Sequence, residues 1–307
     1  MKRIKSSFSI KNLENISGIK AHTIRIWEKR YNLLYPERTD TNIRRYSLDS
    51  LRNLLNITLL YNHGYKISKI ANLEEEDIPI LVREIALKSN SEQVSINAFK
   101  LAMVNFDTVL FDATFDELLA SNNFDFVYLH IFIPLMKELG ILWQTGAISP
   151  SHEHFITNLV KQKIHIQTEL IQRSNTPTIN YPQYVVFLPD NEIHELTALF
   201  LNYYLQNKGH KTIFLGQSIP TQSLKTLLSY SSALHFIAHS TVEPNKDKIN
   251  AYLDDFASEI LEGTNNRLSL FGPQVKHVDR VNLSEGIKVY TKIETFIQEQ
   301  LDITVFV

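Results

Sequence analysis

The 307-residue chain contains no cysteine, which excludes disulfide bonds, thiolate metal sites and cysteine nucleophiles. It has no apolar run near the roughly 18 residues that a membrane-spanning helix needs. Its basic start, Met1 to Lys5, leads into no apolar segment of the kind that a secretory signal requires. No Ser/His/Asp order, glycine-rich phosphate loop or paired-carboxylate spacing is apparent. These absences favour a cytoplasmic protein that does not bind membranes and is not an enzyme.

The charged residues are distributed unevenly, although the formal net charge is only −2. Residues 1–73 hold 14 Lys and Arg against 5 Asp and Glu, a net charge of +9. The rest of the chain holds 17 against 28, a net charge of −11. A basic N-terminal part joined to an acidic body indicates a nucleic-acid-binding domain fused to a domain of another kind.

The basic part has the punctuation of a helix-turn-helix followed by a small hairpin. Ser9 is a good N-cap for a short helix that buries Leu13 and Ile16, and Gly18 marks a turn before a second helix over 21–31. The turn-forming residues 39–42 predict a β-hairpin, or wing. Ser47 then predicts the cap of a helix that ends at Gly64, and a last short helix is expected over 67–73.

Several motifs in this part resemble the MerR family of winged-helix transcription regulators. They are Thr23 to Tyr31, Leu33-Leu34, Pro36 to Thr39 and Arg44 to Ser47, and the resemblance spans about residues 8–73. It implies a homodimer that binds a double-stranded DNA operator. It further implies that the second helix enters the major groove and that the wing follows the DNA backbone.

The candidate DNA contacts are polar and basic side chains of that helix and wing. Arginine and lysine can neutralise phosphates, arginine can also pair with guanine, and a tyrosine hydroxyl can donate to a phosphate. The alternative is that these side chains form an ordinary solvated surface. The candidates are His22, Thr23, Arg25, Lys29 and Arg30 on the helix, and Arg38, Arg44, Arg45 and Tyr46 on the wing.

The body divides into a helical part and an α/β part. No strand pattern occurs over 78–173, where helices are expected at 78–89, 92–105, 107–121, 124–145 and 149–173. After a polar segment at 175–182, strands at 184–188, 211–215, 234–238 and 267–271 alternate with helices, the first of them at 192–208. This alternation predicts a doubly wound, Rossmann-like parallel sheet. The predicted domains are a winged helix-turn-helix at 1–77, a four-helix-bundle cap at 78–174 and the Rossmann-like domain at 183–307.

Two motifs in the body resemble the cobalamin-dependent, CarH/LitR-like light-responsive branch of the same family. One is Trp143 followed after nine residues by Glu153-His154, and the other runs from Glu192 to Thr197. The resemblance implies that cobalamin, in its adenosyl form, is the cofactor. It makes His194 the lower ligand of cobalt and Glu192 its supporting acid. It also places Trp143, Glu153 and His154 around the adenosyl group, and Ser240 in a Ser-x-Leu motif.

Three positions depart from the pattern of this branch. Thr197 stands where the branch has a glycine after the histidine, and a side chain there obstructs close approach of the backbone to a ligand. Phe271-Gly272 stands where the branch has Gly-Gly beside the cobalamin nucleotide tail. Gln144 replaces a histidine that captures cobalt after photolysis, so the light-driven bis-histidine state of the branch is not expected.

Two functions therefore compete. The first is a DNA-binding regulator, expected to be a repressor, that senses cobalamin and changes between a homodimer and a higher homo-oligomer. The second is a regulator of the same architecture with a degenerate pocket, which acts through another ligand or a protein partner independently of cobalamin. A third, the corrinoid carrier subunit of a methyltransferase, is disfavoured because such a protein has no use for a DNA-binding head.

Overall fold

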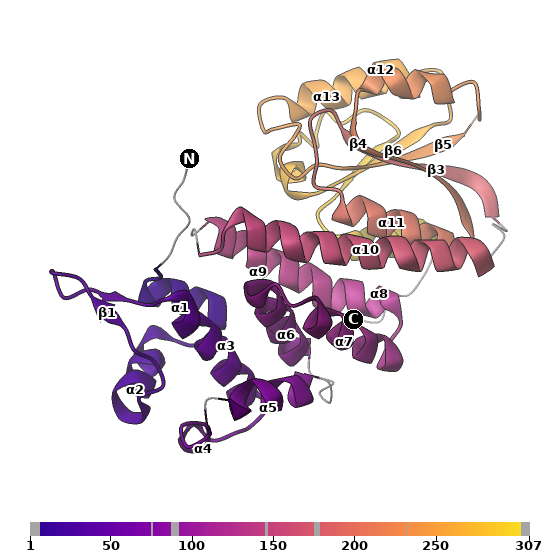
Figure 1. The fold of residues 1–307 in the computed structure, drawn as a ribbon. Coiled ribbons are helices and arrows are strands. Elements are labelled where there is room, and N and C mark those ends of the chain that lie inside the picture. The colour runs from indigo at the N-terminus through magenta and orange to yellow at the C-terminus, as the bar shows by residue number, and fades with distance from the viewer. Residues whose placement is uncertain are drawn as a thin grey trace. The chain divides into compact units, whose positions relative to one another are not determined.

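The computed structural model of the protein describes residues 7–74, 76–86, 92–144, 147–174, 179–231 and 233–301 (Figure 1). The chain forms two compact units, residues 1–160 and 161–307. The boundary falls within helix α10 (Pro150–Ser174). The first unit holds the basic head and the helical bundle, and the second holds the α/β part.

The head is a helix-turn-helix with a two-stranded wing. Its elements are α1 (Ile10–Ser17), α2 (Ala21–Tyr31), β1 (Glu37–Arg38), β2 (Arg44–Arg45), α3 (Leu48–Asn62) and α4 (Ile67–Ile70). The Ser9 hydroxyl accepts from the Asn12 N–H, and the Asn12 side chain accepts from the Ser9 N–H, so two donors at the start of α1 are satisfied. Gly18 ends α1 in the left-handed region, where glycine meets no side-chain penalty. These features confirm the predicted head, except that α4 is shorter than expected.

The core of the head forms where α1, α2 and α3 meet. Leu13 and Ile16 of α1 are fully buried, as the helical spacing predicted, and so is Ile24 of α2. The wing is joined to this core by a pair of backbone hydrogen bonds between Phe8 and Tyr46, 2.8 and 2.9 Å long. The wing strands therefore continue from the same packed core that holds α2.

The bundle is built from helices, with no strand among the described residues of 78–174. Its helices are α5 (Asp77–Ala86), α6 (Glu92–Asn105), α7 (Thr108–Ser121), α8 (Phe124–Phe126), α9 (Ile133–Gln144) and the first part of α10. One helix was expected over 124–145. The structure instead has a π-helical turn at Val127–Phe132 between α8 and α9. The core is aromatic, with the rings of Phe99, Phe111, Phe115 and Phe132 in contact.

The stretch Phe124–Gln144 is the only one among the described residues with the length and apolar composition of a membrane span. Its buried side chains, including Phe132, Leu135 and Leu139, lie in the bundle core. α9 also contacts α6 within this bundle. Packing in the bundle accounts for these buried apolar side chains, and core helices share the length and composition of this stretch.

The second unit contains a five-stranded sheet in the order β4-β3-β5-β6-β7, with every neighbouring pair parallel. The strands are β3 (Ile179–Pro189), β4 (His210–Ile219), β5 (Leu234–His239), β6 (Arg267–Phe271) and β7 (Ile287–Tyr290). This order confirms the predicted doubly wound sheet. The edge strand β7 was not predicted, because it is only four residues long and its pattern of burial is mixed.

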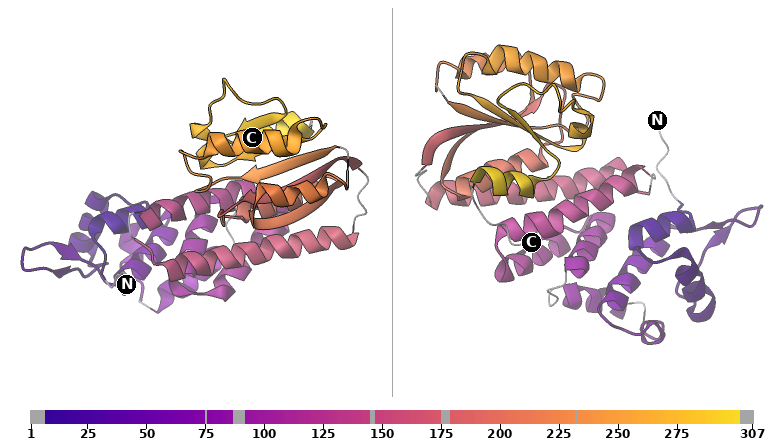
Figure 2. Two further views of the ribbon diagram at one scale, coloured as in Figure 1. Left: turned by 90° about the horizontal axis from the view of Figure 1, so that it is seen from above. Right: turned by 180° about the vertical axis from the view of Figure 1, so that it is seen from behind.

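Helices cover both faces of this sheet (Figures 1 and 2). α11 (Leu196–Asn207) and α14 (Ile293–Leu301) lie on one face, and α12 (Thr221–Leu224) and α13 (Ile249–Phe256) lie on the other. Phe256 of α13 packs on Phe187 and Phe236 of the central strands. The prediction of a helix over 192–208 was wrong at its start, since residues 192–195 form a loop between β3 and α11.

Candidate functional site

The exposed face of α2 carries most of the predicted DNA contacts. Ile24 and Trp27 are buried against the head, so the side chains on the opposite side of the helix face solvent. This division follows from the 3.6-residue period of the helix. His22, Arg25, Lys29 and Arg30 of α2 and Arg38 of the wing are exposed, while Thr23 and Arg45 are half-buried.

A buried cluster around Glu28 connects α2 to the second wing strand. The Glu28 carboxylate accepts from Nε of Arg44 at 3.0 Å and from the Tyr46 hydroxyl at 3.0 Å. Burial and the charge of Glu28 raise the pKa of Tyr46, which keeps its hydroxyl protonated as a donor. The cluster fixes the wing relative to α2, and the sequence motifs alone did not reveal Glu28 as its centre.

This cluster changes the interpretation of Tyr46. The sequence predicted that the Tyr46 hydroxyl contacts a phosphate, but the ring is fully buried and the hydroxyl is bonded to Glu28. A phosphate contact would require the ring to leave the core. In the structure Tyr46 supports the wing, and the charge of Arg44 is shared with Glu28.

In the bundle, Trp143 lies near the end of α9 with 48% of its surface exposed. An exposed indole at this position differs from an ordinary core tryptophan, because the apolar ring is left for another surface to cover. Glu153 and His154 occupy the first turn of α10, with 3.7 Å between Oε2 of Glu153 and Nε2 of His154. The neighbouring His152 stacks on Phe106. Burial lowers the pKa of His152, which favours a neutral packing role.

The second unit holds the best-defined polar site, in the loop that follows β3. Glu192 is 1% exposed, and its Oε1 accepts from the backbone N–H of Ile193 and His194 and lies 2.5 Å from Nδ1 of His194. Its Oε2 accepts from the backbone N–H groups of Thr241, Val242 and Glu243 at 2.6–3.0 Å. One carboxylate thus joins the loop after β3 to the loop after β5.

The protonation state of Glu192 follows from these contacts. Burial by itself would raise the pKa of this carboxyl, but hydrogen bonds from the His194 side chain and from backbone N–H groups outweigh it. The pKa of Glu192 is therefore held well below its usual range. A permanent carboxylate against Nδ1 fixes the orientation of the His194 ring and makes Nε2 the nitrogen suited to ligate a metal.

The loop around Glu192 is held in place by the neighbouring strand end. Asn191 and Ser218 both have positive φ, and the Asn191 N–H donates to the Ser218 hydroxyl at 2.9 Å. The Ser218 N–H donates to the carbonyl of Glu192. Glu195 forms an ion pair with Lys161. The loop is preorganised at the carboxyl edge of the sheet, the edge at which doubly wound proteins bind ligands.

Ser240 and Gly272 form a close backbone contact beside this loop. Gly272 has a φ of 108°, and a Cβ placed there would lie 2.3 Å from the Ser240 carbonyl oxygen. Ser240 is fully buried, and its hydroxyl donates to the carbonyl of Glu243. The predicted contact residue Ser240 therefore shapes the loop that holds Glu192. The second glycine of the expected Gly-Gly pair is required here by sterics.

Phe271 occupies a position that the resemblance assigns to glycine. Its ring is buried, stacked on Tyr290 at 5.3 Å and edge-on to Phe296 at 5.0 Å. Phe296 also contacts His235, which in turn contacts Tyr184 of the central strand. An aromatic cluster therefore packs this face of the sheet under α14. The rings of Tyr290 and Phe296 therefore pack against residue 271, the position that the resemblance sets beside a nucleotide tail.

The residues fit a corrinoid at one end of the site and depart from the family pattern at the other. The fitting end is His194, oriented by Glu192, together with the loop shaped by Ser240 and Gly272. The departing end is Phe271. Thr197 is half-buried in the first turn of α11, just after the loop that carries His194. A separate cluster of three or more His, Asp or Glu residues able to hold a metal ion is absent from the part of the chain that the structure describes.

Sequence reasoning missed two parts of this site, the backbone donors of residues 241–243 and the side chain of His239. The backbone donors of residues 241–243 carry no side-chain signal. His239 lies at the end of β5 with Nδ1 3.2 Å from the Thr241 hydroxyl, and burial lowers its pKa to about 4, so it is neutral. Trp143, Glu153 and His154 belong to the first unit, and Glu192, His194 and Ser240 belong to the second.

Comparisons with known proteins match the head and the helical bundle to two family models. Residues 8–77 match the MerR HTH family regulatory protein model, and residues 95–166, which include Trp143, Glu153 and His154, match the B12 binding domain model. The HTH-type transcriptional repressor CarH of Myxococcus xanthus is 24% identical over 224 residues, covering 71% of this chain and 73% of CarH. The repressor CarA of the same organism is 23% identical over 220 residues, covering 70% of each chain.

Among solved structures, a monomethylamine corrinoid protein of Methanosarcina barkeri aligns with a TM-score of 0.42 and 11% identity, covering 69% of this chain and 91% of that chain. The domain assignment rests on the sequence matches and not on this structural likeness. The chain combines a MerR-type helix-turn-helix domain with a B12-binding domain and is homologous to the transcriptional repressors CarH and CarA. It is a transcriptional regulator of that type.

Proposed function

We propose, starting from the homology to CarH and CarA, that this protein is a cytoplasmic transcriptional repressor whose body senses a corrinoid. The observation that carries corrinoid sensing is the His194 ring, held by a buried carboxylate on a preorganised loop at the carboxyl edge of the sheet. A corrinoid, if bound, would supply a cobalt ion that an imidazole nitrogen can ligate. Glu192 would orient His194 and keep Nδ1 engaged, so that Nε2 would be the nitrogen that holds the metal.

The DNA side of the proposal uses the exposed face of α2 and the wing. Two heads related by a two-fold axis would place two copies of α2 in successive major grooves of a symmetric operator. A change in assembly of the body would alter how many heads reach the DNA together. Joining heads raises their effective concentration at the operator, so assembly controls occupancy without altering any DNA contact.

The adenosyl form is the proposed ligand because Trp143 leaves an exposed indole available to cover an apolar group. Glu153 and His154, which follow at the family spacing, supply polar groups for its ribose and base. Gln144 stands where a second cobalt-binding histidine would be needed after photolysis. An amide is a poor cobalt ligand compared with imidazole, so we do not expect a bis-histidine product after illumination.

Retention of corrinoid by the wild-type protein tests this proposal directly. Purified protein is mixed in the dark with adenosylcobalamin and passed through a desalting column, and its visible spectrum is recorded before and after green light. We expect a corrinoid spectrum in the protein fraction, because His194 is preorganised for ligation. A spectrum with a bis-histidine signature after light would overturn the expectation drawn from Gln144. A colourless protein fraction would refute corrinoid sensing.

The aromatic cluster at Phe271 favours a second candidate function, a repressor of the same architecture that is independent of cobalamin. Side chains of Phe271, Tyr290 and Phe296 are in mutual contact where the resemblance expects a nucleotide tail. In that case the body would act through another small molecule or through a protein partner. A colourless fraction together with unchanged operator binding in the presence and absence of adenosylcobalamin would support this candidate.

Arg25→Ala is expected to weaken DNA binding and to reduce its salt dependence. Arg25 is exposed on the face of α2 opposite the buried Ile24 and Trp27. If it neutralises one phosphate, its loss should cost on the order of tenfold in affinity and lower the salt slope by about 1. The probe is a duplex selected by the wild-type protein from a random pool, titrated at several salt concentrations.

The matched control for this test is Arg280→Ala, which removes the same charge from an exposed position in the α/β part. It should leave both affinity and slope unchanged. Wild-type affinity in Arg25→Ala would remove Arg25 from the DNA interface. A loss of affinity confined to particular base pairs, with an unchanged salt slope, would make it a base contact instead.

A further inference from the structure

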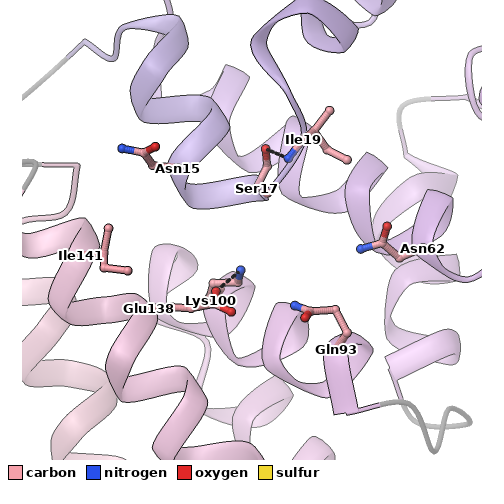
Figure 3. Close-up of a pocket in the computed structure, with 9 residues that line it drawn as sticks. Asn15, Ser17, Ile19, Asn62, Gln93, Lys100, Glu138 and Ile141 are labelled. Carbon is pink, nitrogen blue, oxygen red and sulfur yellow. Dashed lines mark hydrogen bonds and ion pairs between the residues drawn. The ribbon is translucent and has the colours of Figure 1, made fainter.

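A buried ion pair joins the DNA-binding head to the helical bundle within the first unit. Lys100 of α6 is 2% exposed, and its Nζ donates to Oε2 of Glu138 on α9 at 2.7 Å (Figure 3). The same Nζ donates to the carbonyl oxygen of Ile16 in the head at 3.2 Å. One ammonium group thus connects three helices, and the residues it links in head and bundle are 84 positions apart in the chain.

The contact with Ile16 is a favourable one for the head. Ile16 lies in the last turn of α1, where carbonyl groups lack partners within the helix and the helix dipole is negative. A lysine ammonium is suited to both features. α1 is the first helix of the helix-turn-helix and contacts α2 and α3. Lys100 therefore binds the head at a helix that supports the DNA-contacting α2.

The two partners of Lys100 differ in their access to water. Lys100 itself is enclosed, whereas the Glu138 side chain is 36% exposed. Glu138 borders a cavity of about 320 Å³ that is lined from the head by Asn15, Ser17 and Asn62 and from the bundle by Gln93 and Ile141 (Figure 3). Glu138 has room to turn toward water in this cavity. Lys100 would then be a buried charge held only by the carbonyl of Ile16, which is strongly unfavourable.

We infer that Lys100 and Glu138 form a latch that couples the position of α9 to the docking of the DNA-binding head on the bundle. When α9 keeps Glu138 against Lys100, the ammonium is neutralised and α1 is held. When α9 moves Glu138 away, the ammonium loses its counter-charge and keeps only the Ile16 carbonyl, so water entering the cavity beside Lys100 competes with α1 for the ammonium. The inference rests on the proposed function in one respect: Trp143, five residues beyond Glu138 on α9, makes this helix the one that would respond to a corrinoid.

The latch can be measured by the distance between spin labels on head and bundle in the full-length protein. Because the chain has no cysteine, Lys11→Cys on α1 and Asp116→Cys on α7 introduce the only two labelling sites. Both positions are exposed. We expect a single narrow distance distribution in the otherwise wild-type chain without corrinoid. Lys100→Met should broaden it, because methionine fills the space but cannot bind Glu138 or Ile16.

Binding of the selected duplex provides a second readout. A head that is no longer held loses preorganisation, so Lys100→Met should weaken binding at least tenfold, about 1.4 kcal/mol. The matched control is Lys137→Met, at an exposed position next to Glu138 on α9. It should retain both the narrow distribution and the wild-type affinity. A narrow distribution and unchanged affinity in folded Lys100→Met would overturn the latch.

Glu138→Gln keeps the test decisive if Lys100→Met fails to fold. It removes the negative charge at a half-exposed position and leaves an oxygen that can still accept from Lys100. We expect partial broadening of the distance distribution, and a wild-type distribution would overturn the latch. The label distances are recorded first without corrinoid, so they test the latch even if the protein retains no adenosylcobalamin. Failure of corrinoid retention alone would refute the proposed function.

Discussion

His194→Ala protein is expected to leave the desalting column without corrinoid under conditions in which the wild-type protein retains it. The substitution removes the imidazole that Glu192 orients at Nδ1 in the loop after β3. Loss of the His194 imidazole as a cobalt ligand should weaken corrinoid binding by about a hundredfold, on the order of 3 kcal/mol of binding free energy. The visible spectrum of the protein fraction, normalised to protein concentration, measures the effect.

A matched control is His277→Ala, which removes an exposed histidine from the same unit. It should retain as much corrinoid as the wild-type protein. Far-ultraviolet circular dichroism should be the same for both variants, because neither side chain lies in the core of the sheet. Equal retention by His194→Ala and wild type would show that His194 is not a ligand. The contact between the buried Glu192 and the exposed His194 would then serve only to shape the loop.

Glu192→Gln is expected to destabilise the second unit and to change the pH dependence of its unfolding. At pH 7 the carboxylate accepts hydrogen bonds from three N–H groups of the loop after β5, whereas an amide would place its own N–H near some of these donors. The substitution replaces one buried carboxylate oxygen by an amide nitrogen, so the N–H groups that bond to that oxygen lose their acceptor. We expect a loss on the order of 3 kcal/mol in the free energy of unfolding, measured by urea denaturation.

The pH dependence follows from the lowered pKa of Glu192. Because the pKa is lower in the folded protein than its ordinary value of 4.5, this carboxylate contributes its full stability above that value. The contribution is lost as the pH falls below 4.5 toward the folded-state pKa. The stability difference between wild type and Glu192→Gln should therefore be constant near neutral pH and should shrink in acid. Glu285→Gln, at an exposed position, is the control and should show no such difference. A difference that stays constant through the acid range would contradict the assignment.

The local patterns were sufficient for much of the fold. Ser9 and Ser47 begin helices because their hydroxyls accept from the N–H groups three residues later, and Gly18 ends α1 because it adopts a positive φ. The apolar run in β3 predicted a buried parallel strand, which the central position of β3 in the sheet confirms. The predictions failed where an element is short or interrupted, as in β7 and in the π-helical turn before α9. There, contacts with neighbouring elements outweigh local preference.

The candidate site also combines features that local sequence patterns predict with features that depend on tertiary packing. His194 was recognisable from its motif, but its helical placement was wrong, because hydrogen bonds from the loop to Glu192 and Ser218 compete with the first turn of α11. Tyr46 was recognisable as a wing residue, but its burial against Glu28 depends on the packing of the wing on α2. Neither result can be read from spacing along the chain.

The amino-acid sequence by itself determined the type of each domain and the residues of its motifs, since periodicity, capping and motif spacing are local properties. The tertiary structure alone decided which groups meet. It brought the N–H groups of residues 241–243 to Glu192, filled the space beside Phe271 with Tyr290 and Phe296, and placed Lys100 between Ile16 and Glu138. The reason is physical: burial removes water from these groups, so a charge or ring must take its partners from whichever segments the fold brings beside it.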